Sequence, residues 1–159
     1  MQVLAKNKMR DERFIAEHRG GSLKIEQHRQ LIIWACNCAE HVFPLLSEKS
    51  DERLKNAIFI AKEWEKGKAT TGDARNASLN AIAVANESSD PVAITIARAV
   101  GHAVATAHMA DHSLVAAWYA LKAVRHAGKS TDAEKKWQNE QLPLEITELV
   151  LTSRNKTAH

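Results

Sequence analysis

The residues with the greatest chemical potential lie between Gly101 and His112. His108 and His112 are four positions apart and would share one helix face, a spacing used by metal-binding histidine pairs. A zinc protease of this pattern needs a glutamate directly after the first histidine, and Met109 stands there. On one straight helix His102 lies roughly 240° around the axis from His108, so the three imidazoles would not converge. We therefore expect structural histidines, hydrogen-bonded between packed helices.

The alternative is a small all-helical metal-dependent hydrolase. It would use His108 and His112 as ligands, Asp111 as a third ligand if the helix bends there, and a carboxylate such as Glu40 from another helix. Buried histidines need no metal, because each ring can donate a hydrogen bond to a carbonyl or carboxylate on a neighbouring helix. We therefore predict no bound metal and no cofactor.

A second set of reactive residue types lies closer to the N-terminus. His28, Trp34 and His41 could be interpreted as an acid–base set, but they lie far apart along one helix axis. An ordinary half-exposed helix at a solvated surface or an interface contains the same residue types. The chain also lacks a G-x-x-x-x-G-K-[ST] phosphate loop and a G-x-S-x-G nucleophile elbow. We assign no catalytic residue and predict that the protein is not an enzyme.

The two cysteines, Cys36 and Cys38, are separated by one residue. On a helix their side chains point about 200° apart, which is a poor geometry for a disulfide. No second cysteine pair is present to complete a zinc centre. We expect reduced, buried thiols in a cytoplasmic protein, with Cys38 and Trp34 serving the core.

The histidine-rich stretch requires a helix to position it, and the sequence predicts one over about 91–109. Asp90 is a good N-cap, and Pro91 occupies the first helical position, where proline is favoured. From there to residue 121 the only formal charges are Arg98 and Asp111. A solvent-facing helix would show a broad charged stripe. We therefore predict a central helix that neighbours bury on several sides.

Gly101 lies in the middle of this helix. Glycine inside a helix costs about 1 kcal/mol relative to alanine. The sequence therefore predicts a compensating gain at Gly101, most simply the close approach of another helix.

Apolar periodicity, N-cap residues and glycine or proline stops predict the remaining helices. They span about residues 22–43, 51–65, 70–85, 113–126 and 130–151, the last interrupted at Leu142-Pro143. The predicted fold class is all-α: one domain, a bundle of about six or seven helices around the central helix at about 91–109. We expect residues 1–21 to form a leader and arm, 22–151 the bundle, and 152–159 a flexible tail.

Composition narrows the classes of partner. With 159 residues, of which 45% are hydrophobic, the chain is long enough to bury a core without a metal or disulfide. The net charge of +3 is mildly basic, and lysines and arginines alternate with acidic residues instead of forming a one-sided stripe. The first ten residues lack the apolar region of a signal peptide, and charges interrupt the most apolar helix. We predict no nucleic-acid partner and no membrane span.

Several stretches resemble a known family. They are Arg10-Asp11-x-Arg13-Phe14, Arg19-Gly20-Gly21, His28-Arg29-x-Leu31-x-x-Trp34-Ala35-x-x-Cys38-Ala39-Glu40, Gly101-His102-Ala103-Val104-Ala105-x-Ala107-His108-Met109-x-Asp111-His112, Ala120-Leu121-Lys122-Ala123-Val124, Trp137-Gln138 and Gln141-Leu142-Pro143. In these stretches the chain resembles the immunity-family-five-like proteins, bacterial immunity proteins associated with polymorphic toxin systems. The block from Gly101 to His112 is the most specific, and the segment from Met1 to Lys8 lies outside the resemblance.

The resemblance implies an all-helical protein that protects its own cell by binding and blocking a cognate protein toxin. It supplies no catalytic residues. It does not identify the toxin, the binding surface or the oligomeric state.

Overall fold

The computed structural model describes residues 11–156, and these form seven α-helices without a β-strand. The helices are α2 (Ile25–His41), α3 (Glu52–Glu65), α4 (Thr71–Glu87), α5 (Pro91–Ala105), α6 (His112–His126), α7 (Thr131–Glu140) and α8 (Leu144–Lys156). Three short 3-10 turns accompany them: η1 (Glu12–Phe14), η2 (Glu17–Arg19) and η3 (Phe43–Leu45). The predicted all-α bundle is confirmed. The segment from Met1 to Lys8, expected as a leader, lies outside the described residues.

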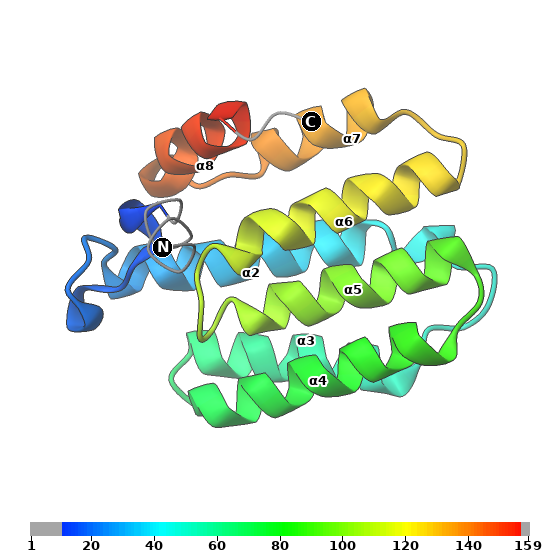
Figure 1. The fold of residues 1–159 in the computed structure, drawn as a ribbon, viewed down its shortest axis with the longest axis horizontal. Coiled ribbons are helices and arrows are strands. Elements are labelled where there is room, and N and C mark those ends of the chain that lie inside the picture. The colour runs from blue at the N-terminus through cyan, green and yellow to red at the C-terminus, as the bar shows by residue number, and fades with distance from the viewer. Residues whose placement is uncertain (1–10, 157–159) are drawn as a thin grey trace, which may run out of the picture.

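Helix α5 is the central element of the bundle. It contacts α2, α3, α4 and α6. In Figure 1, α4, α5 and α6 lie side by side, α2 lies behind α5 and α6, and α7 and α8 flank α6 and α2. Nine of the fifteen residues of α5 are buried, as expected for a helix with a single charged side chain. The predicted central helix is confirmed, with its C-terminal end at Ala105 instead of about 109.

The early end of α5 has an identifiable cause in the hydrogen bonds of Thr106. In a continuing helix the Thr106 carbonyl would accept from the amide four residues later. Here it accepts from Nε2 of His28 on α2, at 2.6 Å, while the Thr106 hydroxyl donates to the His102 carbonyl at 3.1 Å. The next backbone amides, of Ala107 and His108, bond three residues back in tight turns. The chain therefore reverses over residues 106–111 and enters α6.

Other helix ends follow their local sequence. The Thr70 hydroxyl accepts from the Asp73 amide and the Asp73 carboxylate accepts from the Thr70 amide, both at 3.0 Å, which is a reciprocal capping box. After α3 and α6 the chain passes through Gly67 and Gly128 with φ of 77° and 74°. Glycine adopts this left-handed conformation without a Cβ penalty, so both residues stop their helices where expected.

Two groups of buried apolar side chains fill the bundle. The first is rich in alanine and lies among α2, α3, α4, α5 and α6. The second joins the N-terminal segment to α2, α6 and α8, and its large members are Phe14, Leu23, Leu31, Trp34, Ile146 and Val150. Arg13, next to buried Phe14, donates to the hydroxyls of Thr152 and Ser153 at 2.8 and 3.1 Å. These contacts explain why α8 continues to Lys156, into the segment expected as a flexible tail.

Gly101 is buried where α5 crosses α4. A Cβ atom placed on Gly101 would lie 2.5 Å from Cδ1 and 2.9 Å from Cγ1 of Ile82, and 3.5 Å from the Ser78 carbonyl oxygen. The two helices can approach this closely because Gly101 has no side chain. This is the compensating gain that the sequence predicted.

We predict that Gly101→Leu destabilises the protein by about 1–3 kcal/mol, because overpacking forces side chains and backbone apart. For a chain of this size the melting temperature would fall by roughly 2–12 °C, which circular dichroism can measure. Gly101→Ala should destabilise the protein less than Gly101→Leu. Both Cγ1 and Cδ1 of Ile82 must still move away from the new Cβ, but the alanine regains up to ~1 kcal/mol of helix propensity.

The double variant Gly101→Leu/Ile82→Ala tests the contact itself. It should recover part of the lost stability, because the truncated Ile82 leaves room for the leucine. An unchanged melting temperature in Gly101→Leu would show that the close approach of α4 to Gly101 is unimportant.

Candidate functional site

The reversal between α5 and α6 gathers the three histidines of the Gly101–His112 block. His102 lies one turn before the end of α5, His108 lies in the reversal, and His112 is the first residue of α6. The Nδ1 atoms of His102 and His112 are 2.9 Å apart, and the ring centres of His108 and His112 are 5.5 Å apart. The argument against convergence of the imidazoles applies to one straight helix, whereas the reversal between α5 and α6 brings the rings close together.

The contact between His102 and His112 requires at least one neutral ring, since one Nδ1 donates and the other accepts. The pKa of His102 is lowered to about 4 by burial and by the nearby His112 and Arg98. The pKa of His108 is lowered by burial, by His112 and by the guanidinium groups of Arg75 and Arg19. Near pH 7, His102 and His108 are therefore neutral imidazoles in a cationic environment.

The three imidazoles and two aromatic side chains of α6 form a continuous series of ring contacts. Successive ring centres along this series are 5.5, 5.0, 5.4 and 5.0 Å apart. We call it the ring series, and its members in order are His108, His112, His102, Tyr119 and Trp118. The outer end is Trp118, which is 41% exposed, with the Lys122 ammonium 5.0 Å from its ring centre. The ring series thus connects the helix reversal to the surface.

The metal-site hypothesis gains no support from this arrangement. Within residues 11–156, no three or more histidine, cysteine or acidic side chains are placed to hold a metal ion. Of the candidate ligands His108, His112 and Asp111, His112 directs Nδ1 at His102 instead of toward a shared centre. Glu40, suggested as a further carboxylate, forms an ion pair with Lys62 at 3.0 Å.

The second candidate set is separated in the structure. His28 bonds the Thr106 carbonyl, and Nε1 of Trp34 donates to the Gln138 carbonyl at 2.8 Å. His41 contacts the Glu134 carboxylate through Nδ1 at 2.6 Å, and its ring stacks on another indole, that of Trp137, with centres 3.4 Å apart. His28 therefore serves the contact of α2 with the end of α5, whereas Trp34 and His41 bind separate residues of α7, and the acid–base hypothesis lacks a shared site.

A buried polar network around Arg154 was missed in the sequence. Its guanidinium donates to the side-chain oxygens of Gln138 and Asn139 at 2.6 and 2.7 Å and lies 5.6 Å from the ring centre of Trp34. The Gln138 side chain also donates to the Ala117 carbonyl at 3.1 Å. Burial lowers the pKa of Arg154. The network fastens α7 and α8 to α2 and α6, and no periodicity in the polar α7 sequence indicates it.

Cys36 and Cys38 are free thiols in the core. Burial raises the pKa of Cys36 to about 12 and raises that of Cys38 as well. Because the thiolate is the reactive form, neither cysteine is prepared for nucleophilic chemistry.

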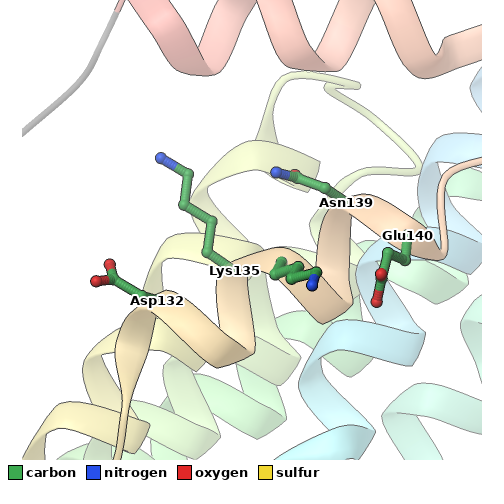
Figure 2. Close-up of a pocket in the computed structure, with 5 residues that line it drawn as sticks. Asp132, Lys135, Asn139 and Glu140 are labelled. Atoms are coloured by element: carbon green, nitrogen blue, oxygen red, sulfur yellow. The ribbon is translucent and has the colours of Figure 1, made fainter.

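One concave region of the surface, on α7, does not suggest a catalytic centre. A hollow of about 460 Å³ is lined by Asp132, Lys135, Lys136, Asn139 and Glu140, all from α7. Figure 2 shows that the labelled side chains point in different directions, with Lys135 and Asn139 directed upward in this view and Glu140 downward. A ligand site has polar groups that converge, whereas this is the solvated surface of one helix.

Fold and site together define an all-helical protein whose most organised surface feature is a partly exposed ring series. Its histidines lie close together but form no metal-holding group within residues 11–156. A family model described as "Imm-5 like putative immunity protein" matches residues 21–145. The chain belongs to this family of immunity proteins. Comparison with curated proteins and with solved structures gives no match. None of the helices within residues 11–156 combines the length and apolar character needed to cross a bilayer.

The lowered histidine pKa values predict that acid destabilises the protein. Between pH 6.5, the ordinary value, and about 4, the unfolded chain binds more protons at His102 than the folded chain does. The free energy of unfolding should therefore be highest above pH 6.5 and fall as the pH drops toward 4. Asp11 and Asp51 pair with Arg13 and Arg53, which lowers both carboxyl pKa values below 3.8, so their contribution disappears only at lower pH.

Urea unfolding at pH 7.5, 6.0 and 4.8 can test this prediction. His102→Gln should flatten the pH dependence, whereas His18→Gln, a change to an exposed side chain, should leave it as in the unmodified protein. Equal pH dependence in all three proteins would show that His102 does not couple folding to protonation.

Proposed function

We propose that this protein binds a cognate toxin and neutralises it by occlusion, as a binding protein and not as an enzyme. The observation that supports the proposal most directly is membership of the immunity-protein family over residues 21–145. The separation of His28, Trp34 and His41 is consistent with it, because occlusion requires a surface and no reacting groups.

We further propose that the partner is a protein toxin of a bacterial polymorphic toxin system and that the two meet in the cytoplasm. The two reduced thiols in the core fit that compartment, because cytoplasmic reductants keep cysteines in this form.

Co-expression tests the proposal. The toxin domain encoded beside this gene should stop growth when produced alone, and the protein should restore growth. The purified pair should form a complex on size-exclusion chromatography. Failure to rescue and to bind every toxin domain encoded beside the gene would contradict the proposal.

Titration of toxin activity separates occlusion from enzymatic detoxification. Occlusion predicts that inhibition is complete at one equivalent of protein and reverses when the complex dissociates. Lasting inactivation by a few hundredths of an equivalent would instead indicate that the protein is a catalyst.

A further inference from the structure

The outward face of α5 and α6 is unusually poor in acidic residues. From Pro91 to Thr131 the chain has one carboxylate, on Asp111, against four lysines and arginines. The two helices lie side by side with α2 behind them (Figure 1). Within residues 11–156, Arg98 on α5 and Lys122 on α6 have no ion-pair partner. This face therefore presents positive charge that the described part of the protein leaves uncompensated.

Trp118 lies at the outer end of the ring series on this face. The ring centres of Trp118 and Tyr119 are 5.0 Å apart in an edge-to-face contact, and the Lys122 ammonium lies 5.0 Å from the ring centre of Trp118. Tyr119 stacks on His102, with ring planes within 13° of each other. These contacts hold the indole in place before any partner arrives. An ordered, exposed tryptophan beside cations is typical of an energetic anchor at a protein interface.

Other exposed apolar side chains lack this organisation. Phe59 on α3, Leu79 on α4 and Leu144 on α8 are at least half exposed, but none takes part in a ring or cation contact. On α3 two of the three cations are compensated: Arg53 pairs with Asp51 and Glu87 at 2.9 and 2.7 Å, and Lys62 pairs with Glu40 at 3.0 Å. Electrostatic complementarity between partners therefore favours the α5–α6 face.

We propose that the α5–α6 face around Trp118 is the docking surface for the toxin, and that the toxin presents an acidic surface there. Carboxylates of the toxin would pair with Arg98 and Lys122, and an apolar recess would receive the indole of Trp118. This inference rests on the proposed function, because it names the surface and the partner chemistry for that activity.

Affinity measurements with the toxin domain encoded beside the gene test the proposal. Trp118→Ala should weaken binding on the order of 30-fold or more, as truncation of an interface anchor does. Arg98→Glu and Lys122→Glu should each weaken it about tenfold through repulsion of the acidic surface. Raising salt from 50 to 300 mM should weaken the unmodified complex more than the Lys122→Glu complex.

Matched controls come from α3. Phe59→Ala removes a comparably exposed aromatic ring, and Lys55→Glu reverses an exposed lysine; both should bind within twofold of the unmodified protein. Melting temperatures of all variants verify folding. Trp118→Phe serves as a milder variant that keeps the packing on Tyr119, and its affinity should lie between those of the unmodified protein and Trp118→Ala.

Each outcome has a distinct meaning. If the unmodified protein neither binds nor neutralises the toxin, the proposed function fails and the docking surface fails with it. If it does both and the folded Trp118 and charge-reversal variants bind equally well, only the docking surface is overturned. Tighter binding by Lys122→Glu would overturn the acidic chemistry of the partner, and loss of binding in Phe59→Ala alone would place the interface on α3.

Discussion

The hydrogen bond from His28 to the Thr106 carbonyl is the interaction on which the arrangement of this protein depends. It is buried, short and directed at a carbonyl that would otherwise continue α5. A donor supplied from α2 thus ends one helix and allows the next to return alongside it. Because the reversal falls between His102 and His112, it also brings those two rings into contact. The bond requires only that Nε2 of His28 carries a proton. Burial lowers the pKa of His28, and the bond to the Thr106 carbonyl opposes this shift.

The second determinant of the arrangement is the small size of the core residues, which sets the distance between the helices. Alanines dominate the core among α2, α3, α4, α5 and α6, and Gly101 allows α4 to approach α5 until Ile82 fills the space of a side chain. Closely packed helices bring many backbone and Cβ atoms into contact. These contacts supply dispersion energy that large side chains would otherwise provide, because this energy depends on the number of neighbouring atoms. The cost is sensitivity to volume, because a large side chain at Gly101 would displace Ile82 and push α4 away from α5.

The sequence predicted the parts of this structure that local interactions decide. Helix starts were predicted from N-cap sequences, at Asp90-Pro91 and at Thr70 with Asp73. Helix ends were predicted from glycines, at Gly67 and Gly128. Each of these signals acts within a few residues. The end of α5 could not be predicted, because its cause, His28, lies 78 residues earlier. The Arg154 network was missed for the same reason. Residue type alone also could not distinguish buried Trp34 from exposed Trp118, since both lie on amphipathic helices.

The polar groups inside the bundle either are uncharged or are hydrogen-bonded to one another. Charge for binding a partner is therefore available only at the surface. His102 and His112 bond each other, Gln138 and Asn139 solvate Arg154, and the core thiols stay protonated. Recognition by charge is therefore restricted to the surface, where α5 and α6 have cations and almost no carboxylates. The ring series joins the interior to the surface, because His102, which the reversal brings against His112, also supports Tyr119 and, through it, Trp118. A surface held in this way loses little conformational freedom on binding, so more of its contact energy is available as affinity.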